Sequence, residues 1–263
     1  MNSRFTLDAD LDLALRLADA AREISLARFR GSFQKRLKAD GSIVTEVDEA
    51  VEDELRELLA RERPADAILG EERGESGSGE RRWIIDAIDG TLSFAAGETG
   101  WGTLIGLEVG GKVVVGVCDD PARDRRSWAV KGRGAFRTEG ASRPTRLKVS
   151  SASELERARS FVPPAQWVRG DEAQAMAAAL EAATRPTEAD DHPALQVAAG
   201  SYDVAVFFMA GPWDLAAPLL VVEEAGGRFT DLNGASTLTA GAVFSNGALH
   251  DATLGCLRAA RGR

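Results

Sequence analysis

Two aspartates at the end of an apolar segment are the residues best suited to chemistry in this sequence. Asp86 and Asp89 follow the run Trp83-Ile84-Ile85, and Gly90-Thr91 comes directly after them. The apolar run favours a buried β-strand, because aromatic and β-branched side chains fit a pleated surface. Two carboxylates at the end of such a strand repel each other unless a cation or several N–H donors neutralise them. The pattern therefore indicates a site for a metal ion and a phosphate group.

The same stretch has two alternative interpretations. The order Asp86-Ala-Ile-Asp89-Gly-Thr91 nearly matches the Asp-x-Asp-x-Thr pattern of phosphatases that use an aspartyl nucleophile. That pattern places its acids two residues apart, whereas these are three apart, so the geometry for a covalent mechanism is lost. An aspartate before a glycine is also common in turns, which would give Asp89 a purely structural role.

Three other acidic segments accompany this stretch. They are Lys38 to Asp48, Leu69-Gly-Glu71-Glu72, and Gly211-Pro-Trp-Asp214-Leu-Ala-Ala217 with the helical run that leads to Gly227. Together with the stretch from Asp86 to Thr91, and in this order, they resemble the inositol monophosphatase-like family of magnesium-dependent, lithium-sensitive phosphatases. The resemblance extends from about residue 10 to the C-terminus. It implies an α/β protein with the layered α-β-α-β-α sandwich of the inositol monophosphatase and fructose-bisphosphatase type.

The resemblance also implies a set of metal ligands. In the family pattern Asp86 bridges two metal ions, Glu71 and the Ile88 carbonyl complete the first, and Asp89 with Asp214 complete the second. A third, weaker ion lies near Glu71. The proposed ligands are all oxygen atoms, with no histidine or cysteine among them, and such a set favours Mg²⁺, with Mn²⁺ as a substitute, over zinc.

The expected reaction is hydrolysis of a phosphate monoester by water, without a phosphoenzyme. Two cations about 3.5–4 Å apart stabilise both the entering and the leaving oxygen of an in-line displacement. Thr91 begins a short predicted helix, so the Gly90 and Thr91 amides are expected to bind the phosphate. The Thr91 hydroxyl, with Glu71 or Asp48, is expected to accept the proton of the water. Asp48 also forms a capping box with Thr45, which alone would explain its presence.

Within the family, the chain is most similar to the histidinol-phosphate phosphatase branch. The segments from Asp119 to Phe136 and from Ser245 to Asp251 carry this similarity. Three departures affect the substrate: Ala87 replaces a usual proline, Leu92-Ser93 replaces a pair such as Lys-Asn, and Phe207 stands where relatives carry a glutamate that contacts the substrate.

The substrate-binding residues expected from the resemblance are Asp89, Asp190, Asp191 and Phe207. Histidinol phosphate is the leading substrate, and inositol phosphate or another cyclitol, sugar or nucleoside monophosphate is the alternative. His192 follows Asp191 and is a candidate for substrate contact, whereas His250 opens the last predicted helix and is expected to be structural. A catalytically silent binding relative is the alternative from a different functional class.

The composition limits the possible partners. The net charge is −9 and the isoelectric point is near 5.0, which argues against nucleic acid, because a phosphate backbone requires a basic face. The chain has two cysteines, too few for a disulfide framework, and it lacks the run of about 18 apolar residues that a membrane span requires. We expect a cytoplasmic homodimer that acts on a small phosphorylated metabolite.

Hydrophobic periodicity predicts two halves. In the first, residues 1–146, two amphipathic helices around Leu11–Ala21 and Val47–Leu58 precede the first strand. Strands are expected at 82–86, 102–108, 113–118 and 127–130, with Gly110-Gly111 as a hairpin turn. The Gly-Ser-rich segment 74–79 is expected to be a loop that is mobile in the absence of metal. In the second half, residues 147–263, helices and strands alternate. The expected elements are a helix capped by Ser151–Glu154, strands at 161–162, 203–208 and 242–245, helices at 172–183 and 214–224, and a last helix.

Overall fold

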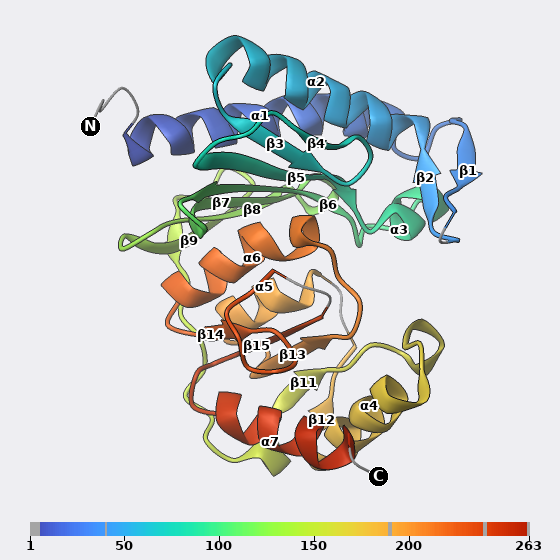
Figure 1. Cartoon of the computed structure of the whole chain (residues 1–263), viewed down its shortest axis with the longest axis vertical. Coiled ribbons are helices and arrows are strands. Elements are labelled where there is room, and N and C mark those ends of the chain that lie inside the picture. Colours follow the sequence, from blue (N-terminus) through green and yellow to red (C-terminus); the bar gives the residue numbers. More distant parts are fainter. Residues whose placement is uncertain (1–5, 40, 189–190, 239–240, 262–263) are drawn as a thin grey trace.

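The protein is built of alternating layers of helices and sheets, seen in a computed structural model that describes residues 6–39, 41–188, 191–238 and 241–261. From one end to the other, the layers are α1 with α2, the larger sheet, α5 with α6, the smaller sheet, and α4 with α7 (Figure 1). This order confirms the predicted α-β-α-β-α sandwich of the α/β class.

The helices are α1 (Leu7–Arg28), α2 (Glu46–Glu62), α3 (Thr91–Ala96), α4 (Asp171–Ala183), α5 (Pro193–Ala198), α6 (Pro212–Glu224) and α7 (His250–Arg261), among the described residues. The strands in the same part of the chain are β1 (Lys35–Leu37), β2 (Ile43–Thr45), β3 (Ala67–Gly70), β4 (Gly74–Ser76), β5 (Arg81–Asp89), β6 (Gly102–Val109), β7 (Lys112–Asp120), β8 (Arg125–Val130), β9 (Gly134–Glu139), β10 (Thr145–Arg146), β11 (Arg159–Phe161), β12 (Arg185–Pro186), β13 (Val204–Phe207), β14 (Arg228–Thr230) and β15 (Ala242–Ser245).

The larger sheet has eight strands in the order β10-β9-β8-β7-β6-β5-β3-β4. From β5 to β10 each strand pairs antiparallel with the next, as the short predicted connections require, and only β3 and β5 are parallel. Gly110-Gly111 joins β6 to β7 and confirms the predicted hairpin turn. The strand predicted at residues 82–86 is β5, which is longer than expected and continues to Asp89.

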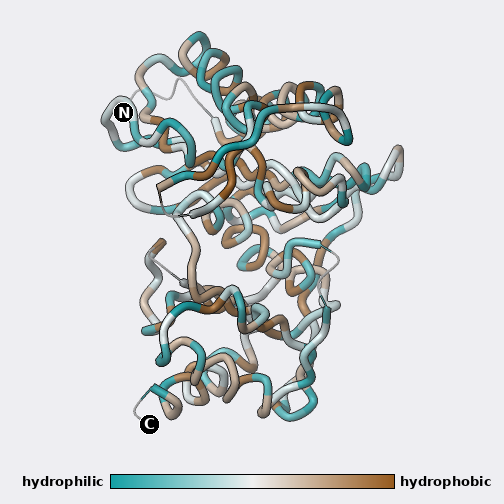
Figure 2. Tube along the Cα trace, turned by 90° about the vertical axis from the view of Figure 1, so that its right-hand side faces the viewer, coloured by the Kyte–Doolittle hydropathy of each residue, from teal (hydrophilic) through white to brown (hydrophobic). Residues whose placement is uncertain are grey.

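Two helical layers cover the two faces of this sheet. On one face α1 and α2 bury apolar residues such as Leu17, Val51 and Leu55 against the strands. On the other face α6 packs directly on β6 and β7. A Cβ atom on Gly116 would lie 2.7 Å from the Ala217 carbonyl oxygen, so glycine is required there for α6 to approach the sheet so closely. Hydrophobic stretches lie mainly in the interior strands, and the outer turns are mainly hydrophilic (Figure 2).

The smaller sheet is mixed. It has the order β12-β11-β13-β15-β14, in which β11 runs parallel to β12 and β13 and the remaining pairs are antiparallel. The strand predicted at residues 242–245 is confirmed, as is the last helix. The helix predicted after Ser151–Glu154 is wrong. A single 3-10 turn over Leu155–Arg157 occupies that position, because Asn246 donates a hydrogen bond of 2.8 Å to the Ala152 carbonyl and holds the segment before it against the end of β15.

Several elements were not expected from the sequence, among them β3, β9, β10, β12, β14 and α5. A hairpin of β1 and β2 lies between the first two helices, and β4 pairs antiparallel with β3 inside the segment predicted as a mobile loop. The predicted division at residue 146 coincides with the end of β10, although α6 from the second half packs on the sheet of the first. The division into two halves therefore stays a prediction. No helix of the described part of the chain has the length and apolar character needed to span a membrane.

Candidate active site

Asp86 and Asp89 lie near the carboxyl end of β5, in the middle of the larger sheet. The pairing of β5 with β6 is irregular between these two residues, so the alternation of side chains is interrupted there. Asp86 is 2% exposed. Gly90 follows with φ of 78°, and a Cβ atom at this position would lie 2.4 Å from the Gly100 carbonyl oxygen. Glycine is therefore needed at the turn that leads from the two carboxylates into α3.

Asp214 reaches the same place from the second half of the chain. It is the third residue of α6, and its Oδ2 accepts a hydrogen bond of 2.5 Å from the Gly211 amide, so it also closes the first turn of the helix. Because α6 packs on β6 and β7, this helix start is brought to the end of β5. Asp214 thus closes the first turn of α6 and also places a carboxylate beside Asp86 and Asp89.

Asp86, Asp89 and Asp214 form a cluster of carboxylates. One ligand atom from each lies within 4.8 Å of the others, and within the described residues this is the group whose geometry suits a metal ion. Burial, together with the charges of Glu71 and the neighbouring aspartates, raises the pKa of Asp89 to about 7 and that of Asp214 to about 7. The same causes hold the pKa of Asp86 well above its usual value. Bringing three carboxylates together is therefore unfavourable without a cation, as expected for a cation-binding site.

Glu71 lies beside this cluster and is paired with a lysine. It follows β3, which runs parallel to β5, and its amide donates to the Ile85 carbonyl at 3.3 Å. Its Oε1 accepts a hydrogen bond of 2.8 Å from Lys38 Nζ, and Lys38 Nζ also donates to Glu72 Oε1 at 2.7 Å. Burial lowers the pKa of Lys38, but these two hydrogen bonds outweigh it and raise the pKa above its usual value.

Thr91 and Asp48 are in direct contact. The Thr91 hydroxyl lies 2.9 Å from Asp48 Oδ1 and 3.1 Å from the Ile88 carbonyl oxygen, so it has two acceptors for its single proton. Asp48 also completes the predicted capping box of α2 with Thr45, which is confirmed. Burial raises the pKa of Asp48, whereas its hydrogen bonds to Thr45 and Thr91 lower it. The capping role thus holds the carboxylate in place, with its other oxygen on Thr91.

Asp191 is already engaged by other residues. Its Oδ2 accepts hydrogen bonds from Arg125 at 2.6 Å and from Gln196 at 3.1 Å, and its Oδ1 accepts from the His192 amide at 2.7 Å. The carboxylate is close enough to Asp89 to contribute to the raised pKa of that residue. Asp191 therefore borders the cluster, although its oxygens are used by neighbours. Asp190, predicted with it, lies outside the described residues.

Phe207 lies in a group of aromatic rings. Its ring stacks on His192 with centroids 5.6 Å apart and an angle of 27°, and it also contacts Phe161 and Phe244. The buried Nδ1 atom of His192 has no hydrogen-bond partner. Burial lowers the pKa of His192 to about 4, although the Asp191 charge opposes the shift, so the imidazole is neutral at pH 7.

His250 is structural, as expected. Its two ring nitrogens lie 2.8 Å from Ser245 Oγ and 2.9 Å from Thr230 Oγ1, and both His250 and Ser245 are 0% exposed. This is a serine–histidine pair, but its complete burial excludes a substrate from the hydroxyl. The pair is therefore compatible with the expectation that no serine–histidine nucleophile takes part in the reaction.

A model of the inositol monophosphatase family matches residues 7–260. The chain belongs to the inositol monophosphatase family. A histidinol-phosphatase from Mycobacterium tuberculosis is 43% identical to this family member over 95% of this chain and 98% of the relative. A histidinol-phosphatase from Streptomyces coelicolor is 41% identical over 94% and 96% of the two chains.

Solved structures agree with this assignment. An IMPase from Thermotoga maritima has a TM-score of 0.83 and 27% identity, over 95% of this chain and 97% of that chain. The predicted resemblance to the histidinol-phosphate phosphatase branch of the inositol monophosphatase family is confirmed. This family member is a phosphoric monoester hydrolase.

The raised pKa values of the cluster lead to a prediction about pH. When metal is removed, the folded protein retains protons that the unfolded chain releases near pH 3.8, so its stability falls as pH rises through about 7. His192 and His250 act in the opposite direction up to about one pH unit above their usual pKa of 6.5, and they offset part of this fall. Between pH 6.5 and 8 in EDTA, we expect the unfolding free energy to fall by about 1–2 kcal/mol.

Thermal unfolding followed by circular dichroism would measure this dependence. A saturating divalent cation should raise the melting temperature and flatten its pH dependence, because the cation binds the charged form of the folded protein. A metal-free melting temperature that rises between pH 6.5 and 8 would contradict the proposed electrostatics of the cluster.

Several residues of the site were missed from the sequence. The sequence carries no local signal for the contact of Lys38 with Glu71 or for that of Arg125 with Asp191. Glu52 is 0% exposed on α2 and accepts hydrogen bonds from the Glu72 and Arg73 amides, so it anchors the loop that follows Glu71. The only available signal for Glu52 was its place on the apolar face of a predicted helix, where a lone acid is unusual.

Proposed function

We propose that this phosphatase is a magnesium-dependent histidinol-phosphatase. The observation that carries the proposal is the 43% identity to a histidinol-phosphatase over nearly the full length of both chains. A second histidinol-phosphatase with 41% identity supports the same substrate. Inositol phosphate and other cyclitol, sugar or nucleoside monophosphates remain the alternative substrates.

The carboxylate cluster fits a hard divalent cation. Asp86, Asp89 and Asp214 supply oxygen atoms within 4.8 Å of one another, and their raised pKa values indicate that the cluster is incomplete without positive charge. We propose that they hold Mg²⁺ with Glu71 and the Ile88 carbonyl as further ligands, with two or three ions per site and Mn²⁺ as a substitute. When bound, the cations would supply an activated water and stabilise charge on the phosphate and the leaving oxygen.

Thr91 and Asp48 are the proposed proton-accepting pair. Asp48 is 1% exposed and is held by the capping box, so its carboxylate is a fixed acceptor for the Thr91 hydroxyl. A hydroxyl that donates to Asp48 can accept a hydrogen bond from a water molecule, and as the hydroxyl oxygen takes the proton of that water, its own proton would pass to Asp48. Glu71 is the alternative acceptor, although its Oε1 is bound to Lys38.

The phosphate is proposed to meet the start of α3. The Thr91 amide is at the first position of this helix, where amides have no partner within the helix. The Gly90 amide was predicted to share this role, but it also donates to the Asp89 carboxylate and lowers its pKa. We therefore assign the larger part of the phosphate contact to Thr91.

The leaving alcohol is proposed to lie against Phe207, with Asp89, Asp190 and Asp191 nearby. Phe207 and His192 present stacked rings, which suit an imidazole ring better than a polyol that needs several hydrogen-bond partners. A pocket with such partners discriminates by up to about 10⁴–10⁵, whereas an apolar wall discriminates by about 10–200-fold. Inositol phosphate should therefore be a weak substrate.

Steady-state kinetics on a panel of phosphate monoesters test this proposal. With Mg²⁺ present, kcat/KM should be highest for histidinol phosphate, and about 10–200-fold lower for inositol 1-phosphate, the limit expected of an apolar wall. Efficient turnover of inositol phosphate by the wild-type protein would refute the pocket argument. Failure on both substrates would indicate a different alcohol.

The variant Phe207→Glu examines the pocket directly. The ring packs among Phe161, Phe244 and His192, so a glutamate would be partly buried against aromatic rings, which is unfavourable for a charge. Activity on inositol phosphate should therefore rise by no more than about tenfold, within the range expected of an apolar pocket. Phe207→Leu is the matched control, because it removes the ring without adding a charge.

We also propose that the enzyme acts on a small phosphorylated metabolite, assembles as a homodimer and is located in the cytoplasm. Both Cys118 and Cys256 are free thiols, which suits a reducing compartment.

A further inference from the structure

Helix α3, which begins with Thr91, is too short to be stable alone. It spans six residues, and glycines in the left-handed conformation bound it at both ends. A helix of this length makes few internal hydrogen bonds, and its stability comes from contacts with the rest of the protein. The position of the Thr91 hydroxyl therefore depends on what holds the helix.

The hairpin of β1 and β2 holds the first turn of α3 indirectly. Thr45, the last residue of β2, forms the capping box with Asp48, and Asp48 Oδ1 accepts the hydrogen bond of 2.9 Å from the Thr91 hydroxyl. Lys35 in β1 is the cross-strand neighbour of Thr45. The hairpin thus brings a cation next to the residue that fixes Asp48.

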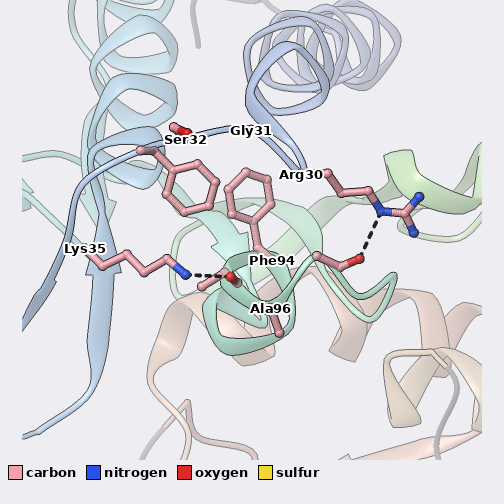
Figure 3. A pocket seen from close by; sticks show the side chains of 9 residues that line it. Arg30, Gly31, Ser32, Lys35, Phe94 and Ala96 are labelled. Atoms are coloured by element: carbon pink, nitrogen blue, oxygen red, sulfur yellow. Dashed lines mark hydrogen bonds between the residues drawn. The ribbon is translucent and has the colours of Figure 1, made fainter.

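The same hairpin and the segment before it hold the last turn of α3. Lys35 Nζ donates a hydrogen bond of 2.6 Å to the Ala95 carbonyl, and Arg30 Nε donates one of 3.0 Å to the Gly97 carbonyl (Figure 3). These carbonyls lie at the negative end of the helix, where a cation is favourable. Lys35 and Arg30 line a cavity of about 520 Å³ beside α3.

Aromatic contacts fix the middle of the helix. Phe94, the buried residue of α3, packs against Phe33 with ring centroids 5.2 Å apart and against the edge of Trp101 at 4.8 Å. Phe33 lies two residues before Lys35, and the Lys35 ammonium is 5.4 Å from its ring centroid. The segment from Arg30 to Lys35 therefore contacts the middle and the end of α3. Through Thr45 and Asp48 it is also connected to the start of this helix.

We propose that Lys35 is a positioning residue for the reaction, which clamps the end of α3 so that the Thr91 hydroxyl stays on Asp48. The inference rests on the proposed function of Thr91. Lys35 does not touch the carboxylate cluster in the described structure, and its effect passes through α3. Displacements of about 1 Å at a reacting group can lower a rate by about 100-fold, so a small tilt of this helix has a measurable effect.

The first experiment compares Lys35→Met with Lys35→Arg and with a control on the same strand. We expect Lys35→Met to lower kcat by about fivefold to tenfold, a modest part of the loss that misplacement can cause, with a smaller change in KM. Lys35→Arg should restore at least half of the activity, because it keeps a donor and a charge. Arg36→Met, which removes an exposed cation bound to Glu49 instead, should leave kcat unchanged.

Folding is measured alongside activity. Lys35 is exposed, so the melting temperature of Lys35→Met should remain close to that of the wild type. If it falls by more than about 4 °C, Lys35→Ala replaces it, since alanine also removes the donor and the charge but adds no exposed apolar side chain. A wild-type kcat in a folded Lys35→Met or Lys35→Ala variant would overturn the proposal.

A double-mutant cycle with Thr91→Ala separates positioning from a general structural role. If Lys35 acts through Thr91, Lys35→Met should change kcat by less than about twofold in the Thr91→Ala background, whereas independent effects multiply. Equal losses in both backgrounds would overturn the inference. If Thr91→Ala itself keeps full activity, the proposed function of Thr91 fails, and this result is distinct from failure of the clamp.

Discussion

Asp86→Asn should lower kcat by about 10²–10⁴, because metal stabilisation contributes several kcal/mol and each 1.36 kcal/mol corresponds to a factor of ten. The substitution preserves the volume of the side chain and removes its charge from the centre of the cluster. Asp86 is the most completely buried of the three carboxylates, and burial with the charges of Glu71, Asp89 and Asp214 holds its pKa well above its usual value. Initial rates with saturating substrate and Mg²⁺ measure the effect.

Stability supplies a second measurement on the same variant. In EDTA, Asp86→Asn should melt at a higher temperature than the wild type, because repulsion from Asp89, Asp214 and Glu71 is relieved. Asp10→Asn is the matched control, since Asp10 is 1% exposed but binds Arg63 and Arg81 outside the cluster. It should lower stability and leave kcat nearly unchanged. A folded Asp86→Asn variant with more than half of the wild-type activity would show that the site is wrong.

Removal of divalent cations should lower the rate by at least about 100-fold, since the ligands proposed here are hard oxygen donors and the cation contributes several kcal/mol. Activity should return when Mg²⁺ is added in excess of EDTA, and Mn²⁺ should replace it. Phosphate release after exhaustive dialysis against chelator provides the measurement.

Binding of the cation can be detected without catalysis. Mg²⁺ should raise the melting temperature of the wild-type protein, because a ligand that binds only the folded state stabilises it. The same addition should have a much smaller effect on Asp86→Asn. Full activity after chelation, or an equal thermal shift in both proteins, would contradict the assignment of the cation to Asp86, Asp89 and Asp214.

Elements with a local signal were predictable from the sequence. The capping box of Thr45 and Asp48 involves residues three apart, and the turn at Gly110-Gly111 needs only two residues, so both follow from short-range rules. The apolar alternation that predicts the central strands reflects burial in the sheet. The order of the acidic segments also indicated the protein family, because motifs of this length carry information about the whole fold.

Other elements had no local signal. The β1–β2 hairpin is short and exposed in β1, so hydrophobic periodicity could not indicate it. The segment of β4 is rich in glycine and serine, and it forms a strand because β3 offers an unpaired edge. The helix predicted after Ser151 does not form, since Asn246 from the far end of the chain binds the Ala152 carbonyl instead.

The sequence by itself determined which residues are available for chemistry: an acidic strand end at Asp86 and Asp89, a helix start at Asp214, and a threonine at the beginning of α3. Only the tertiary structure decided that these groups meet. Asp214 reaches Asp86 because α6 packs on strands whose glycines allow close approach, and Lys38 reaches Glu71 from the start of the turn between β1 and β2. Such contacts depend on the packing of distant segments, whereas periodicity and capping rules extend over only a few residues.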